Sequence, residues 1–339
     1  MTTKVKYDIE LMRQLNKEFE TKKFMTEFTE YDEGSQLKQA SHRIDGLSSK
    51  INFDGKKILE IGCGRGHVAY QLVNKFDCEV IGLEVYPRPE WENLLHPKLR
   101  FMHLDMGLEN PFEEEFDVIL SFTVWEHIRH PRTVMQEAVK ALKNGGLFYM
   151  SANLYRSAVA SHLYRNIYFP FPQLLFDDEI VREFALENGV TQHNFDSFYY
   201  LNKLTYAQYK EYFSELNLHI LSEQKTIRKL DIDFYDRFED KLGLYPKHDL
   251  ELDFFYVLLK KMGGTNGICT KMTKLENDTE TLETLTALIQ HLNKTNAKLR
   301  QENEGYRWKL KYITETWYGK LGIRLFRLLR KVKHRIKRS

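Results

Sequence analysis

A short segment with alternating glycines carries the strongest chemical signal in the sequence. It reads Glu60-Ile61-Gly62-Cys63-Gly64-Arg65-Gly66. An apolar run at 57–62 predicts a strand before it, and the apolar spacing of 66–75 predicts a helix after it. Glycine lets the backbone approach a ligand closely, and a helix N-terminus presents N–H groups that lack an internal partner. The segment is therefore typical of a loop that binds a small ligand.

Two familiar nucleotide-binding signatures do not fit this loop. The dinucleotide fingerprint needs its third glycine one position later, where this chain has His67. The triphosphate-binding loop needs Gly-Lys followed by Ser or Thr, and that triplet is absent from the sequence. Gly62 or Gly64 alone would be an ordinary turn glycine, so the interpretation depends on what the surrounding elements supply.

The elements that must position this loop form an alternating series. Strands are predicted at 57–62, 79–84, 99–103, 117–122, 147–152, 219–223 and 254–260. Helices are predicted at 66–75, 133–143, 177–188 and 205–216, after a polar helical segment within residues 1–50. Such alternation predicts an α/β fold with a mostly parallel sheet covered on both faces. The aromatic-rich stretch 153–203 breaks the rhythm and is interpreted as an insertion.

The loop and the ends of the next strands resemble the motifs of the class I S-adenosylmethionine-dependent methyltransferases. Residues 60–66 resemble the first motif of that family. Glu84 ends the second strand, where the family binds the ribose hydroxyls, and Asp105-Met106 follow the third strand, where it contacts adenine. Segments 121–128 and 142–146 look like the stretch from the fourth strand to the fifth. The resemblance covers about 36–261 and implies a Rossmann-like sheet of seven strands, the last antiparallel.

The resemblance also implies a cofactor, S-adenosylmethionine, and a set of residues that bind it. A carboxylate at a strand tip can accept both ribose hydroxyls, as Glu84 would. Glu60 supplies an acid in the region of the cationic sulfonium. The full implied set is Glu60, Gly62, Cys63, Gly64, Gly66, Glu84, Asp105, Met106, Ser121 and Phe122.

Methyl transfer from a sulfonium needs an aligned acceptor and, for a hydroxyl acceptor, a base that removes its proton. The candidate bases are His127, then His162, then His193, with His130 also near the fourth strand. His127 follows the fourth strand, at the sheet edge where such folds bind ligands. Each histidine has an alternative role as a hydrogen-bonded structural or surface side chain.

The insertion supplies candidate acceptor-binding residues. We predict that Trp125, Tyr164 and Arg165 contact the acceptor, because aromatic and arginine side chains suit a sugar ring that bears phosphate or carboxylate. The run 162–170 also resembles an insertion of methyltransferases from surface-glycan gene neighbourhoods. An aromatic mini-core over the active site is the alternative. No metal site is apparent, because Cys63, Cys78 and Cys269 lie at no zinc-ligand spacing.

Composition shows an acidic body with a basic end. The chain has 339 residues, with 50 Lys and Arg against 48 Asp and Glu. Nine of the basic residues and none of the acids fall in 320–339. With no disulfide framework, signal peptide or apolar run of spanning length, we expect a reducing, cytoplasmic location.

Beyond residue 275 the apolar period changes to a heptad. Positions 282, 289, 296, 303 and 310 are a positions, and 285, 292, 299, 306 and 313 are d positions. Asn296 and Asn303 at a favour parallel pairing in register. We predict a coiled coil at 276–317 that forms a homodimer, with a trimer as second choice; a single helix packed on the body is the alternative.

The last segment, 318–339, combines an apolar stripe with many cations. This pattern is typical of an amphipathic helix on an anionic membrane surface. A nucleic-acid patch or a partner-binding helix are the rivals, and the apolar content disfavours nucleic acid. The predicted domains are a helical segment 1–50, a methyltransferase domain 51–261, a linker 262–275, the coiled coil and this helix.

Together these features predict a methyltransferase held at the inner face of the membrane, which O-methylates a sugar of a membrane-proximal or lipid-linked glycan. A soluble acceptor, such as a nucleotide sugar or lipid precursor, is the alternative within the enzyme class. A non-catalytic coiled-coil scaffold of a glycan-synthesis complex is the alternative outside it.

Overall fold

The structure, a computed structural model, describes residues 5–26, 32–199 and 201–263. The predicted coiled coil at 276–317 and the predicted basic helix at 318–339 lie outside the described residues. Within the described ranges, no helix is both long enough and apolar enough to cross a membrane.

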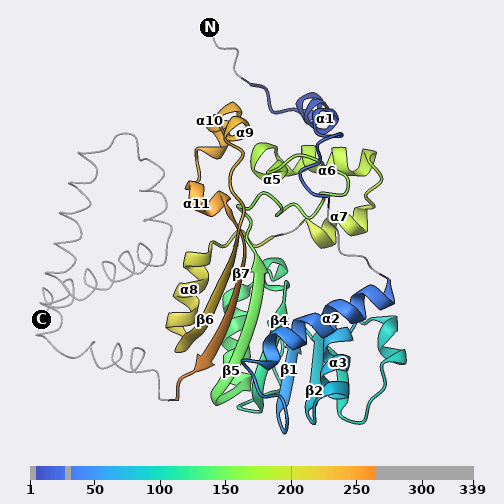
Figure 1. Cartoon of the computed structure of the whole chain (residues 1–339), viewed down its shortest axis with the longest axis vertical. Coiled ribbons are helices and arrows are strands. Elements are labelled where there is room, and N and C mark those ends of the chain that lie inside the picture. The colour runs from blue at the N-terminus through green and yellow to red at the C-terminus, as the bar shows by residue number, and fades with distance from the viewer. Residues whose placement is uncertain (1–4, 27–31, 200, 264–339) are drawn as a thin grey trace, which may run out of the picture. The chain divides into compact units, whose positions relative to one another are not determined.

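Seven strands form a single sheet in the order β3-β2-β1-β4-β5-β7-β6 (Figure 1). The strands are β1 (Lys57–Ile61), β2 (Glu79–Glu84), β3 (Leu99–His103), β4 (Phe116–Phe122), β5 (Leu142–Asn153), β6 (Leu218–Ile227) and β7 (Leu252–Lys261). Strands β1 to β5 pair in parallel, whereas β7 is antiparallel to both β5 and β6. The predicted seven-stranded sheet with an antiparallel last strand is confirmed.

Helices cover both faces of this sheet. On one face lie α2 (Glu33–Ser48) and α3 (His67–Lys75), whose apolar residues join those of β1, β2 and β4 in one buried cluster. On the other face lie α4 (Pro131–Ala141) and α8 (Tyr206–Glu215), which pack on β1, β4, β5 and β7. The helices begin where the sequence supplies caps: Thr205 and Gln208 form a capping box at the start of α8.

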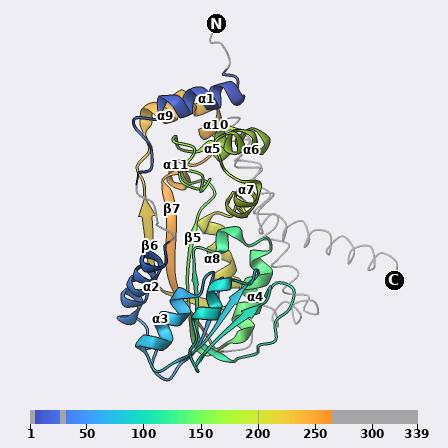
Figure 2. The ribbon, with the colours of Figure 1, turned by 90° about the vertical axis from the view of Figure 1, so that its right-hand side faces the viewer.

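A third buried cluster forms a cap beyond the carboxyl ends of the parallel strands (Figure 2). Its helices are α1 (Ile9–Glu18), α5 (Pro172–Leu175), α6 (Asp178–Glu187), α7 (Gln192–Phe198), α9 (Ile232–Arg237), α10 (Glu239–Leu242) and α11 (Lys247–Leu250). The chain leaves β5 at Asn153 to enter the cap and returns to the sheet for α8 and β6. It enters the cap again after Ile227 and starts β7 at Leu252. The cap is therefore assembled from three separate stretches of sequence, and 153–203 is only one of them.

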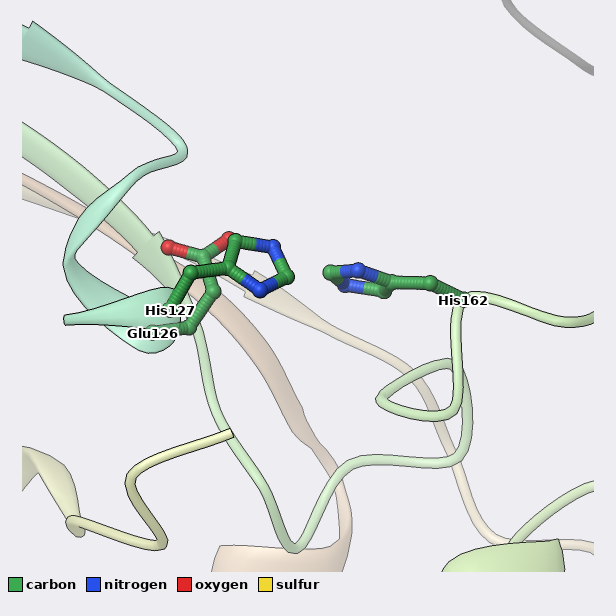
Figure 3. A group of neighbouring side chains, drawn as sticks. All are labelled: Glu126, His127 and His162. Carbon is green, nitrogen blue, oxygen red and sulfur yellow. The ribbon is translucent and has the colours of Figure 1, made fainter. Parts of the chain in front are cut away.

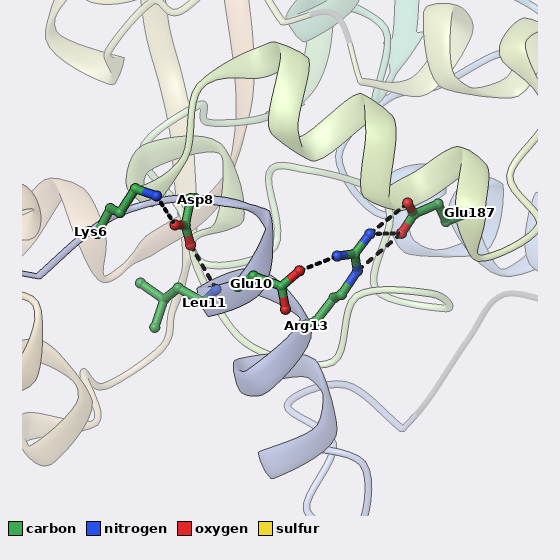
Figure 4. Close-up of polar contacts among 6 residues, drawn as sticks. All are labelled: Lys6, Asp8, Glu10, Leu11, Arg13 and Glu187. Carbon is green, nitrogen blue, oxygen red and sulfur yellow. Dashed lines mark hydrogen bonds and ion pairs between the residues drawn. The ribbon is translucent and has the colours of Figure 1, made fainter.

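Helix α1 illustrates how a remote segment joins the cap (Figure 4). Asp8 caps its N-terminus by accepting a hydrogen bond from the backbone N–H of Leu11 at 3.1 Å. Arg13 makes a bidentate ion pair with Glu187 of α6: its Nη2 donates to Oε1 at 2.7 Å and its Nε to Oε2 at 3.3 Å. Such exposed pairs contribute little to stability, because solvent screens them. Burial of Met12 and Leu15 in the cap core is therefore the main attachment.

The remaining differences from the predicted elements are local. Strand β5 begins at Leu142 rather than at 147, because Phe116 pairs with Leu142 and Val118 next pairs with Leu147. The Asn144-Gly145-Gly146 sequence, predicted to end a helix, is thus an irregularity within the strand. Gly145 has a φ of 78°, which glycine adopts without strain. Two short 3-10 helices, η1 (Pro89–Asn93) and η2 (Trp125–His127), follow β2 and β4.

Candidate active site

The glycine loop lies between the end of β1 and the start of α3 in a conformation that depends on its glycines. Gly62, Gly64 and Gly66 have φ values of 72°, 51° and 85°. A side chain on Gly62 would place its Cβ 2.4 Å from Val124 Cγ2, and one on Gly66 would place it 2.4 Å from Phe101 Cζ. The loop is therefore both left-handed and close-packed, so neither glycine tolerates a side chain without local movement.

Glu84 holds the centre of this loop. Its Oε2 accepts a hydrogen bond from the Gly64 N–H at 3.0 Å, and its Oε1 accepts one from the Val85 N–H at 2.9 Å. On the other side of the loop, the indole N–H of Trp91 donates to the Gly64 carbonyl at 2.9 Å. Trp91 itself stacks on Phe101, with ring centroids 5.0 Å apart. A strand-end carboxylate and a fixed glycine loop thus lie together.

Glu60 is the buried acid of the site. Its side chain is 3 % exposed, and its Oε2 has no hydrogen-bond partner. Burial raises the pKa of Glu60 to about 8, against the opposing charge of Arg43 and a hydrogen bond from the Ala69 N–H. Arg43 is half-buried, and its guanidinium lies over the Phe122 ring at 5.2 Å. A cationic ligand near Glu60 would favour the ionised carboxylate, which fits the sulfonium expected from the sequence.

The raised pKa of Glu60 predicts a pH-dependent effect of Glu60→Gln. The folded state binds the proton of the Glu60 carboxyl more tightly than the unfolded chain does. The stability that this protonated carboxyl contributes is therefore lost as the pH rises from the ordinary pKa of a glutamate towards about 8. Glutamine stays uncharged at every pH. In the absence of ligand, the Tm of the variant minus that of the wild type should therefore increase between about pH 5 and about pH 9. A Tm difference that stays constant with pH would contradict this.

The other residues of the implied cofactor set have mixed surroundings. Cys63 and Met106 are buried, and burial raises the pKa of the Cys63 thiol. Ser121 is fully buried and donates to the Ile61 carbonyl at 2.9 Å, which ties the ends of β1 and β4 together. Asp105 is exposed after β3, and its Oδ1 accepts from the Gly107 N–H at 2.8 Å. Glu84 and Asp105 are thus the acids of this set that reach the surface.

Two of the three predicted bases lie side by side, with their rings in an edge-on arrangement (Figure 3). The rings of His127 on η2 and His162 in the cap insertion have centroids 5.1 Å apart. Glu126, beside His127, is 2 % exposed and completes a group of three potential ligand side chains. Burial raises the pKa of Glu126 to about 8, while burial and then the nearby His127 lower the pKa of His162 to about 3. Both shifts favour the uncharged forms near neutral pH.

The backbone around these side chains is firmly held. Asn202 donates from its backbone N–H to the Glu126 carbonyl at 2.8 Å and from its side chain to the Trp125 carbonyl at 2.6 Å. The Nε2 of His162 lies 3.3 Å from Asn153 Oδ1, and the Asn153 N–H donates to Glu126 Oε1 at 3.2 Å. His127 therefore lies on a fixed loop that also carries Val124, the residue packed against Gly62.

The remaining predicted residues lie elsewhere. His193 is exposed on α7 and takes no part in the three-residue group. Trp125 is fully buried in the core, with its ring 5.8 Å from that of Phe148. We therefore correct its assignment: Trp125, the first residue of η2, anchors this helix in the core and does not face an acceptor. Tyr164 is half-buried and Arg165 exposed on the cap, two and three residues after His162.

Sequence reasoning missed four residues of the site. Arg43, Trp91 and Asn153 each interact with a predicted residue of another element, and Glu126 adjoins His127 on η2. Asn153 ends the fifth strand and Trp91 follows the second, so their positions at strand ends were a usable signal. Nothing in the sequence links Arg43 on α2 to Glu60, because only the fold brings them together.

Comparison with known proteins identifies the domain. Residues 31–197 match a family described as "Methyltransferase domain". The ubiquinone biosynthesis O-methyltransferase of Cereibacter sphaeroides is 32% identical over 110 residues, 31% of this chain and 44% of the relative. Its namesake from Pseudomonas fluorescens is 24% identical over 115 residues, 32% of this chain and 49% of the relative. The chain thus spans less than half the length of these curated relatives.

Solved structures of methyltransferases are also similar in fold. An S-adenosylmethionine dependent methyltransferase from Mesorhizobium loti has a TM-score of 0.45 and 16% identity, covering 66% of this chain and 99% of that one. The 1,6-didemethyltoxoflavin-N1-methyltransferase of Burkholderia thailandensis, which binds S-adenosylhomocysteine, has a TM-score of 0.41 and 13% identity, covering 78% and 94%. Residues 31–197 thus match a methyltransferase domain, in agreement with the enzyme class expected from the sequence.

Proposed function

We propose that this protein transfers a methyl group from S-adenosylmethionine to a hydroxyl group bound between the sheet and the cap. One observation carries the proposal. The loop that carries His127 packs against the glycine loop, because Val124 fills the space where a Gly62 side chain would lie. A candidate base and the cofactor loop are therefore neighbours at the carboxyl edge of the sheet, where α/β folds bind ligands.

The residues of the glycine loop fit the cofactor. The glycines, in left-handed conformations, leave the loop backbone without side chains that would block a ligand. Glu84 offers a carboxylate at the end of a strand, and Glu60 has an oxygen without a hydrogen-bond partner that suits a cationic group. When bound, S-adenosylmethionine supplies an electrophilic methyl group with a good leaving group. The protein's part is to orient the acceptor and remove its proton, and His127 is the first candidate for that proton.

The acceptor we favour is a sugar hydroxyl of a membrane-proximal or lipid-linked glycan. Tyr164 and Arg165, on the cap close to His162 in sequence, are the residues we assign to it. The alternative is a soluble small molecule or a lipid precursor. Among these alternatives, the names of the curated relatives favour a lipid precursor, since those relatives are named for ubiquinone biosynthesis. A non-catalytic scaffold is the third possibility.

A labelled methyl donor distinguishes these acceptors directly. The full chain is incubated with S-adenosylmethionine labelled on its methyl group and, separately, with nucleotide sugars, lipid-linked glycans and phenolic lipid precursors. Label in the glycan fraction supports our choice, and label in the phenolic lipids identifies the alternative. If the chain bound the cofactor but no acceptor became labelled, apart from slow hydrolysis of the cofactor, the non-catalytic scaffold would be favoured.

The C-terminal segments complete the proposal. We propose that 276–317 joins two copies of the chain and that 318–339 attaches the pair to anionic lipid. Two attached helices in one particle would multiply a weak membrane affinity.

Deletion of 318–339 should release the protein from anionic vesicles. The segment holds nine cations within twenty residues, each worth about 1 kcal/mol near an anionic surface. The full chain should sediment with vesicles that contain phosphatidylglycerol but not with neutral vesicles, and the deletion variant with neither. Continued sedimentation of the deletion variant with anionic vesicles would refute the assignment.

A further inference from the structure

The group formed by Glu126, His127 and His162 has the composition of a metal site. One potential donor atom from each side chain lies within 4.8 Å of the other two. The three residues come from η2 and from the insertion, 35 positions further along the chain (Figure 3). Two imidazoles and a carboxylate are a donor set that catalytic zinc sites use, with the fourth position open to water or substrate.

Glu126 presents an oxygen that lacks a partner. Its Oε1 accepts the Asn153 N–H at 3.2 Å, whereas its Oε2 has no hydrogen-bond partner although the side chain is 2 % exposed. The influences on this carboxyl are burial and backbone N–H groups, with no lysine or arginine among them. A buried carboxylate oxygen without a partner costs free energy, and a bound cation would remove that cost.

Asn153 fixes the imidazole of His162 in the matching tautomer. The Nδ2 of Asn153 donates to the Asp253 carbonyl at 2.7 Å and to Ser157 Oγ at 3.2 Å. Its Oδ1 therefore faces His162 Nε2, at 3.3 Å, and can only accept. The hydrogen of His162 consequently lies on Nε2, and the lone pair lies on Nδ1. A histidine that donates one ring N–H to a carbonyl oxygen while its other nitrogen stays bare is the usual arrangement around a metal.

We propose that Glu126 Oε2, His127 and His162 Nδ1 bind one divalent transition-metal ion, with Zn²⁺ as the first choice. Asn153 orients two of the three ligands, one through its backbone and one through its side chain. Metal–ligand bonds of about 2.0–2.3 Å require the donors to draw together by rotation of the side chains. With the ion bound, His127 would hold the metal instead of taking the proton itself. The open position would take the acceptor hydroxyl and lower its pKa, a role that rests on the proposed methyl transfer.

Metal titration of the full chain tests the site without any use of activity. Chelator-treated protein is titrated with Co²⁺, followed by visible absorption, and with Zn²⁺ in competition with a chromophoric chelator. The wild type should bind one equivalent. Glu126→Gln and His162→Gln should each weaken binding by about 100-fold or more, and Asn153→Ser by about 10- to 100-fold. His248→Ala, which removes an exposed histidine of the cap, should bind like the wild type.

Two outcomes would overturn the metal site. One is that the wild type binds no metal, and the other is that Glu126→Gln and His162→Gln bind metal as tightly as the wild type does. Circular dichroism melts and S-adenosylmethionine titrations of each variant show whether it is folded. Because the cofactor titration is done without metal, failure of the metal site leaves the methyltransferase assignment intact. Loss of cofactor binding with retained metal binding would be the converse result.

Discussion

Replacement of His127 by alanine is expected to lower kcat by about 10²- to 10⁴-fold, the usual contribution of a general base. His127 lies on η2, beside the loop that holds the cofactor and opposite His162, at 5.1 Å between ring centroids. His162 is less suited to take the proton, because burial lowers its pKa to about 3. The affinity for S-adenosylmethionine should stay unchanged, since the residues assigned to the cofactor are elsewhere.

Single-turnover methyl transfer and a cofactor titration of the same His127→Ala preparation measure the two quantities. His130→Ala is the matched control, because His130 is an exposed residue of the same loop. If kcat of His127→Ala stayed within a few-fold of the wild type, His127 would only be a structural side chain, and the proton would leave by another route.

Replacement of Glu84 by alanine should weaken S-adenosylmethionine binding by about 10- to 100-fold, which corresponds to hydrogen bonds with a charged partner. The effect has two sources. The variant loses the carboxylate assigned to the ribose hydroxyls, and it also releases the Gly64 N–H that Glu84 now holds at 3.0 Å. The second loss frees the glycine loop to adopt conformations that do not bind.

Calorimetric titration of Glu84→Ala beside Glu79→Ala isolates the effect, because Glu79 is exposed at the opposite end of the same strand. Glu79→Ala should bind like the wild type. Equal affinity of all three proteins would remove Glu84 from the cofactor site.

The sheet and the cofactor loop could be predicted because their signals are local. Strands β2 and β3 have the predicted bounds, since short apolar runs end there at charged or polar residues. The glycine loop was recognisable because three glycines and the acid at the end of β2 occur in fixed order. The structure adds the reason for that order: Glu84 bonds directly to the backbone of Gly64.

The cap could not be predicted from sequence to the same extent. Helices α9 to α11 are too short to show a long apolar period. Helix α1 is separated from its partner α6 by about half of the chain. The pairing of His127 with His162, and of both with Asn153, likewise depends on contacts between distant segments. Trp125 was misassigned for the same reason, since the burial of its side chain depends on how η2 packs on the core.

The most direct test of the account is a calorimetric titration of the full-length wild-type protein with S-adenosylmethionine. Saturable binding of one cofactor per chain is expected, with S-adenosylhomocysteine competing for the same site. A folded chain, verified by circular dichroism, that binds neither compound would contradict the assignment of residues 60–84 as the cofactor site.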